Sequence, residues 1–109
     1  MYEVKLNVFQ GPLDLLLYLI RKNEVDIYDI SIAQIAEQYM EYINLMRMLD
    51  LGVAGEFLVM AATLLQLKSE AMLPAGAASE YDEPMITREE LIRQLLEYKK
   101  FRDAATILS

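Results

Sequence analysis

The stretch FLVMAATLLQL, from Phe57 to Leu67, is the feature that most constrains how this chain can fold. It contains no charged residue, and its only polar residues are Thr63 and Gln66. As a helix it would rise only about 16 Å, roughly half the thickness of a bilayer core, so it is too short to span a membrane. We therefore expect a helix in a soluble protein that is apolar on most sides, and such a helix needs other elements to cover it.

Apolar periodicity and capping signals predict four helices. Proline fits the first turn of a helix, so the first helix should begin at Pro12. Ser31 and Thr87 each stand three residues before a glutamine or glutamate, which is the spacing of a capping box, and they should open the second and fourth helices. The third should end before Pro74. The expected helical ranges are 12–23, 31–46, 53–73 and 87–108.

The rest of the chain suggests how these helices are grouped. Residues 2–8 alternate between apolar and polar, which predicts a short strand or extended arm. Residues 74–86 combine small residues, two prolines and three acids, which is typical of a flexible acidic linker. We therefore expect a mostly α fold, with a compact three-helix N-terminal domain over 1–73, a linker over 74–86 and a separate fourth helix within 87–109.

The composition excludes several classes of function. The chain has 109 residues, with 10 Lys and Arg against 17 Asp and Glu, and it contains neither Cys nor His. The net charge of −7 opposes phosphate-driven binding of nucleic acid. The missing Cys and His exclude the usual zinc ligand sets and the Ser-His-Asp and Cys-His arrangements of catalysis. The first ten residues lack a signal peptide, so a cytoplasmic location is the default expectation.

The densest group of acids is Glu24, Asp26 and Asp29. This run lacks the glycine and the alternation of a calcium-binding loop, so solvated or helix-capping carboxylates are a better interpretation than a metal or catalytic site. We expect neither catalysis nor a bound cofactor.

The apolar third helix indicates a binding function. Each large side chain left exposed there would forgo about 1.5–3 kcal/mol of burial, and an apolar patch of that kind usually marks an interface. Docking on a partner is therefore favoured over complete internal burial, and the natural partner is another helix or a coiled coil. A helix-turn-helix DNA-binding regulator is the alternative, although the second helix carries Glu37 and Glu41 and only Arg47 as a phosphate contact.

Five motifs run through most of the chain. They are FxGPLDLLLxLI from Phe9, DIYDI from Asp26, EQY from Glu37, FLVMAATLLQLKSEAMLP from Phe57 and REELIRQLLEYKKFRDAA from Arg88. Together they resemble the segregation and condensation protein A family, the bacterial kleisins. The resemblance implies a non-enzymatic subunit of a condensin-like complex that organises and segregates chromosomes, in the cytoplasm and associated with the nucleoid.

The resemblance also implies partners. In that family the third helix packs on the coiled-coil neck of a structural-maintenance-of-chromosomes (SMC) ATPase, and the segment after the linker threads along a dimer of segregation and condensation protein B. The neck-binding residues carried over by position are Phe57, Leu58, Met60, Ala61, Leu64, Leu65, Lys68 and Met72. Those for the second partner are Leu91, Ile92, Leu95, Leu96, Tyr98 and Phe101.

That family also carries a C-terminal winged-helix domain, which none of these motifs resembles, so we expect this chain to be an N-terminal fragment. We expect no direct contact of this fragment with nucleic acid or with a membrane. Its apolar surface leaves self-association open.

Overall fold

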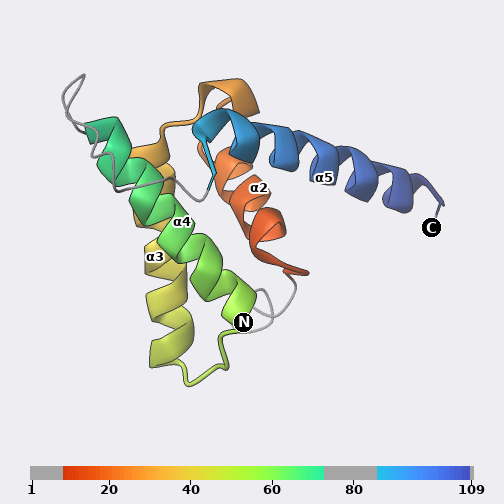
Figure 1. Ribbon diagram of the computed structural model, residues 1–109. Coiled ribbons are helices and arrows are strands. Elements are labelled where there is room, and N and C mark those ends of the chain that lie inside the picture. Colours follow the sequence, from red (N-terminus) through yellow and green to blue (C-terminus); the bar gives the residue numbers. More distant parts are fainter. Residues whose placement is uncertain (1–8, 73–85, 109) are drawn as a thin grey trace.

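The computed structural model describes residues 9–72 and 86–108 (Figure 1). Its elements are α2 (Pro12–Lys22), the 3₁₀-helix η1 (Ile27–Asp29), α3 (Ile32–Met48), α4 (Gly55–Met72) and α5 (Arg88–Leu108). Within the described ranges there are four α-helices and no strand, which confirms the mostly α prediction. The predicted strand or arm at 2–8 and nearly all of the predicted linker lie outside the described residues.

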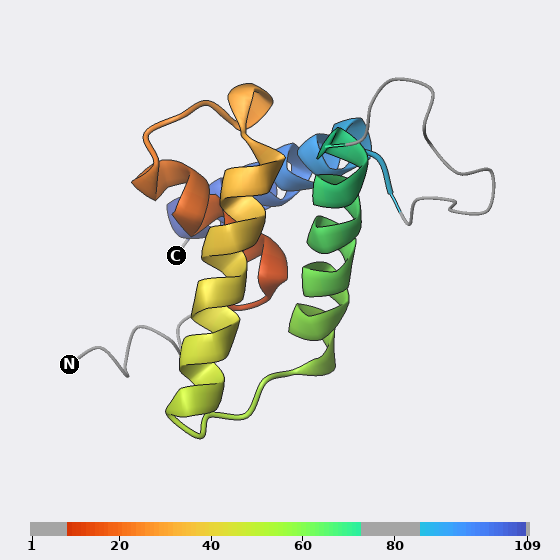
Figure 2. The same cartoon turned by 90° about the vertical axis from the view of Figure 1, so that its left-hand side faces the viewer.

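Helix α2 lies at the centre of the molecule, where it contacts α3, α4 and α5 (Figure 1). Helices α3 and α4 lie side by side and run in opposite directions, joined by a loop at one end of the molecule (Figure 2). Helix α5 crosses near the other end, packs on α2 and η1, and extends beyond them toward the C-terminus. None of the helices described is both long enough and apolar enough to cross a membrane.

The helices start where the capping signals place them. Pro12 is the first residue of α2. The Ser31 hydroxyl accepts a hydrogen bond from the Gln34 amide at 3.3 Å, and the Thr87 hydroxyl accepts one from the Glu90 amide at 3.1 Å. These bonds satisfy amides that the first turn of a helix leaves without a partner, and they confirm the predicted starts of α3 and α5.

The connection between α2 and α3 contains the turn η1, which periodicity did not reveal because three residues are too few to show a helical repeat. A carboxylate oxygen of Asp26 accepts a hydrogen bond from the Tyr28 amide at 3.1 Å. Asp26 therefore caps this turn, as the capping interpretation of the acidic run expects. Asn23 joins the same connection to α3, because its side-chain amide donates to Gln38 at 2.6 Å and to the Leu19 carbonyl at 2.9 Å.

A single apolar core joins all four helices. Its members on α2 are Leu15, Leu16, Leu17, Leu19 and Ile20, which lie on more than one side of the helix. This distribution follows from the central position of α2, which has neighbours on several sides. The first half of α5 contributes Leu91, Ile92 and Leu95 to the same core. The predicted division into 1–73, 74–86 and 87–109 stays a prediction.

Aromatic residues fix α3 against its neighbours at two places. Tyr39 is fully buried, and its hydroxyl donates to the carbonyl oxygen of Phe57 on α4 at 2.8 Å. Phe9, Tyr18 and Tyr42 form a second group, with ring centroids 5.4–6.2 Å apart and tilted or edge-on planes. Such geometry is favourable between aromatic rings, so the segment before α2 and α2 itself are both anchored on α3.

Candidate functional site

Helix α4 has one side that the rest of the chain covers. Its buried side chains are Met60, Ala61, Leu64 and Leu67. Thr63 is buried too, and its hydroxyl donates to the Val59 carbonyl one turn earlier at 3.0 Å. The hydroxyl of Thr63 is the single buried hydroxyl on this side, and it is hydrogen-bonded to the helix backbone. Burying this side of α4 therefore leaves no hydroxyl without a hydrogen bond.

The opposite side of α4 is apolar and open to solvent. Leu58, Val59 and Leu65 are 39%, 56% and 46% exposed, and Ala62 between them is exposed as well. These four residues, which we call the α4 strip, follow one another along a single face at helical spacing. The strip confirms that the chain does not bury all the apolar surface of this helix.

The structure divides the predicted neck-binding residues between these two sides. Leu58 and Leu65 lie on the α4 strip, whereas Met60, Ala61 and Leu64 point into the chain's own core. The sequence left open which face of this helix is exposed, and the burial of these three side chains shows which face the chain itself covers. Contact with the neck itself stays a prediction.

The remaining members of that set are placed as follows. Phe57 is half-buried against the core, and the ammonium nitrogen of Lys68 lies 3.5 Å from a Glu37 carboxylate oxygen. The side chain of Met72 is outside the described part of the chain. Val59 and Ala62 belong to the α4 strip, although the sequence did not single them out. In a helix that is apolar all round, the sequence does not indicate which face is exposed.

A groove runs between α3 and α4 beside the α4 strip, and Leu65 belongs to both. Its volume is about 330 Å³. Apolar side chains form its lining at Ala36, Met40 and Leu65. Polar and charged side chains complete it, and they are Glu37, Glu41, Asn44 and Lys68. We call this feature the α3–α4 groove.

The charges on these two helices are mainly negative. Together α3 and α4 carry four carboxylates against two cations, which are Glu37, Glu41, Glu56 and Glu70 against Arg47 and Lys68. Lys68 is already paired with Glu37. Phosphate groups would be repelled by such a surface, so the helix-turn-helix alternative gains no support from it.

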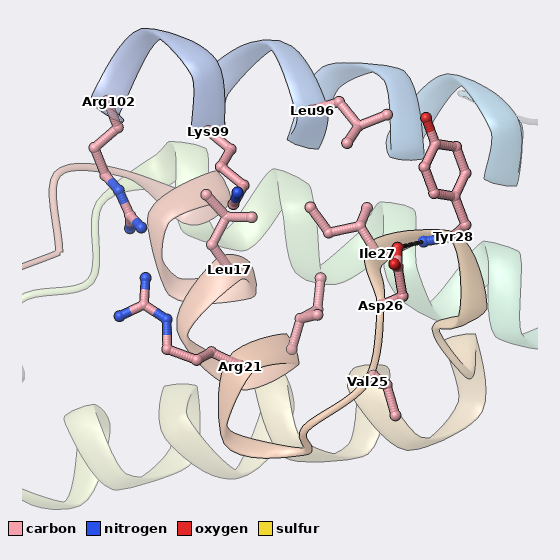
Figure 3. Close-up of a pocket in the computed structure, with 10 residues that line it drawn as sticks. Leu17, Arg21, Val25, Asp26, Ile27, Tyr28, Leu96, Lys99 and Arg102 are labelled. Carbon is pink, nitrogen blue, oxygen red and sulfur yellow. Dashed lines mark hydrogen bonds between the residues drawn. The ribbon is translucent and has the colours of Figure 1, made fainter. Parts of the chain in front are cut away.

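A second hollow, of about 430 Å³, lies between α2, η1 and α5 (Figure 3). Arg21 approaches it from α2, and Lys99 and Arg102 approach it from α5 (Figure 3). Arg102 also holds the two helices together, because one of its guanidinium nitrogens lies 2.8 Å from a carboxylate oxygen of Asp14 on α2. Apolar side chains form much of the remaining lining, at Leu17, Ile20, Val25, Ile27 and Leu96. Asp26 and Tyr28 complete it.

Comparison with known proteins decides the family. The model of the family described as segregation and condensation protein ScpA matches residues 19–109. The chain belongs to this family.

Relatives named segregation and condensation protein A confirm the assignment that the motifs suggested. The protein from Bacillus subtilis (strain 168) is 51% identical over 108 residues, which cover 95% of this chain and 43% of the relative. The one from Enterococcus faecalis (strain ATCC 700802 / V583) is 56% identical over 111 residues, which cover 97% of this chain and 42% of the relative. The one from Caldanaerobacter subterraneus is 52% identical over 111 residues, which cover 100% of this chain and 45% of the relative. The chain thus spans less than half the length of these relatives.

In this member of the segregation and condensation protein A family, the residues predicted for a second partner do not lie on one surface. Leu91, Ile92 and Leu95 are buried in the core shared with α2. Leu96 and Tyr98 are half-buried, and Phe101 is 75% exposed. Periodicity predicts an apolar face on this helix, but it does not say that α2 covers that face. Contact with a second partner stays a prediction.

The described part of this family member offers no obvious metal centre. Within residues 9–72 and 86–108, no group of three or more Asp and Glu side chains is arranged to hold a metal ion. Of the acidic run that sequence analysis considered, Asp26 is occupied in capping η1.

Proposed function

We propose that this chain is the N-terminal part of a non-enzymatic kleisin subunit of a bacterial SMC complex, acting in chromosome condensation and segregation. The observation that carries the proposal is the α4 strip, an exposed apolar face on a helix that the rest of the chain holds firmly. The relatives support it, because segregation and condensation are the processes in their printed names. In this role the chain works at the nucleoid, in the cytoplasm.

In the proposed complex, the α4 strip docks on the coiled-coil neck of the SMC ATPase. A coiled coil presents helices, and a third helix can pack along them by the same ridge-and-groove contacts that hold a helical bundle. Leu58, Val59 and Leu65 are each about half exposed, so their burial would contribute on the order of 1 kcal/mol apiece. Because association also costs free energy, further contacts around the strip must add to these.

Helix α5 is the proposed contact for a dimer of segregation and condensation protein B. While α5 is docked on α2, this contact can use the C-terminal half of the helix, where Phe101 is exposed and Tyr98 half-buried. Leu91 and Leu95 would join it only if α5 left α2, because both side chains are fully buried in the core. The docked chain thus presents two separate surfaces for two partners.

Two valine substitutions test the role of the α4 strip. Val59 on the strip is 56% exposed, and Val25 in the connection after α2 is 41% exposed, so Val59→Glu and Val25→Glu introduce the same charge at comparable sites. The assay is co-elution with an SMC head-plus-neck fragment from the same bacterium, measured by size exclusion with light scattering. Circular dichroism reports whether each variant keeps the parent fold.

We expect Val59→Glu to keep its helical signal and lose co-elution, and Val25→Glu to co-elute like the parent chain. If Val59→Glu co-elutes like the parent, the docking surface is not the α4 strip.

A further inference from the structure

We infer that the helix docking on the α4 strip lays a lysine or arginine side chain across the α3–α4 groove, with its aliphatic stem on Met40 and Leu65 and its cation beside Glu41. This inference rests on the proposed function, since the groove is an extension of the strip. It adds the chemistry of the partner, which would be an apolar helix face bordered by basic residues on the side that meets α3.

The lining of the groove fits a side chain that is apolar along its length and charged at its tip. Ala36, Met40 and Leu65 provide the apolar lining, and carboxylates stand beside them. Lysine and arginine have this division, because their methylene stems pack on apolar surface while the charged head stays near water or an acid. With a volume of about 330 Å³, the groove has room for such a side chain.

The carboxylates of the groove are not equally occupied. Glu37 already faces the ammonium group of Lys68 at 3.5 Å. Glu41 lies one helical turn further along α3, is exposed, and has no ion-pair partner among the residues that the structure describes. Of the two carboxylates in the groove, Glu41 is therefore the one that no described residue pairs, and it is the better acid for a cation from outside.

Whether Glu41 gains a counter-charge on docking should affect the free energy of binding. A partner helix seated on the strip would remove water from the groove, and a carboxylate that loses water without gaining a counter-charge is costly. A partner with an acid or an apolar residue at this position would incur that cost, whereas a basic residue would offset it. Glu41 thus acts as a selectivity element, favouring a basic partner face over others.

The test compares three variants for affinity to the same SMC head-plus-neck fragment, by fluorescence anisotropy at about 50 mM and about 300 mM salt. Glu41→Gln removes the charge and Glu41→Lys reverses it. Glu24→Gln is the matched control, because Glu24 is an exposed acid in the connection after α2 and lines neither the groove nor the strip. Val59→Glu is measured alongside as the test of the strip itself.

At low salt we expect Glu41→Gln to weaken binding about threefold and Glu41→Lys about tenfold, with both differences shrinking at high salt and Glu24→Gln unchanged. If both Glu41 variants bind like the parent, or Glu41→Lys binds more tightly, while Val59→Glu does not bind, the inference is overturned and the proposed function stands. If Val59→Glu binds like the parent, the proposed docking surface fails and the inference fails with it.

Discussion

The hydroxyl of Tyr39 in the middle of α3 donates a hydrogen bond to the carbonyl oxygen of Phe57 in the first turn of α4, with 2.8 Å between the two oxygens. Tyr39 is fully buried, and burial raises its pKa, with a smaller contribution from the negative charge of Glu56. The bond ties the first turn of α4 to the middle of α3. In this arrangement Leu64 faces the core and Leu65 faces solvent.

Replacing Tyr39 by phenylalanine removes this bond and keeps the ring. We expect the free energy of unfolding to fall by about 1 kcal/mol, because a buried hydrogen bond of this kind is lost. For a domain of this size that corresponds to a fall of about 4–8 °C in melting temperature. Tyr28→Phe is the control, because Tyr28 is 62% exposed. Equal melting temperatures for the two variants would show that the Tyr39 hydroxyl does not support the fold.

The two neighbouring leucines of α4 allow a direct comparison of its two sides. Leu64 is 1% exposed and Leu65 is 46% exposed. We expect Leu64→Ala to lower the free energy of unfolding by about 2–5 kcal/mol, since it leaves a cavity. Leu65→Ala should lower it by less than about 1 kcal/mol, since that side chain is only partly covered. Urea denaturation followed by circular dichroism measures both. Similar losses would contradict the assignment of Leu64 to the buried side of α4 and Leu65 to the exposed side.

The ion pair between Asp14 and Arg102 holds α5 on α2 in partly buried surroundings, where the two side chains are 13% and 29% exposed. In a double-mutant cycle with Asp14→Asn and Arg102→Ala, we expect a coupling free energy of about 1 kcal/mol, at the upper end of the range for exposed pairs. The same cycle on Lys99 and Asp103, an exposed pair on α5 at 3.7 Å, should give a smaller value. A coupling near zero for Asp14 and Arg102 would contradict the docked position of the second half of α5.

Alkaline pH should destabilise the fold through Tyr42. Burial, together with a hydrogen bond to Tyr18, raises the pKa of Tyr42 to about 12 from its ordinary value of 10.0. Between these two pH values the unfolded chain has lost a proton that the folded chain retains, so rising pH favours unfolding. The contribution of the neutral phenol is complete below pH 10 and is lost as the pH rises toward 12.

The measurement is the melting temperature as a function of pH, for the parent chain and for Tyr42→Phe. We expect the melting temperature of the parent to fall more steeply above pH 10 than that of the variant. Parallel curves would show that Tyr42 does not titrate late in the folded chain.

Local signals in the sequence predicted the helices well. Pro12, Ser31 and Thr87 stand where α2, α3 and α5 begin, because the chemistry of a helix start depends only on residues within one turn. Helix α4 begins at Gly55, two residues after the predicted Val53. That this helix would keep an exposed apolar face also followed from sequence, since its apolar surface exceeded what one small domain was expected to cover.

The sequence could not predict which face of α4 is buried or where α5 packs. Met60 and Leu65 are equally apolar, so only the packing partners decide which of them is buried. The packing of Leu91 and Leu95 against α2 depends on contacts between residues far apart in the sequence, to which periodicity is blind. The motifs identified the family correctly, yet positions carried over from a family do not say which side of a helix this chain covers.

The distance along the chain between Asp14 and Arg102 has a consequence for the order of folding. The pair joins residues 88 positions apart, whereas Tyr39 and Phe57 are 18 apart. Closing the larger loop costs more chain entropy, so α3 and α4 should form their contact first and α5 should dock last. The helix that docks last should also be the first to leave during transient opening. We therefore expect opening of α5 to precede any movement of α4.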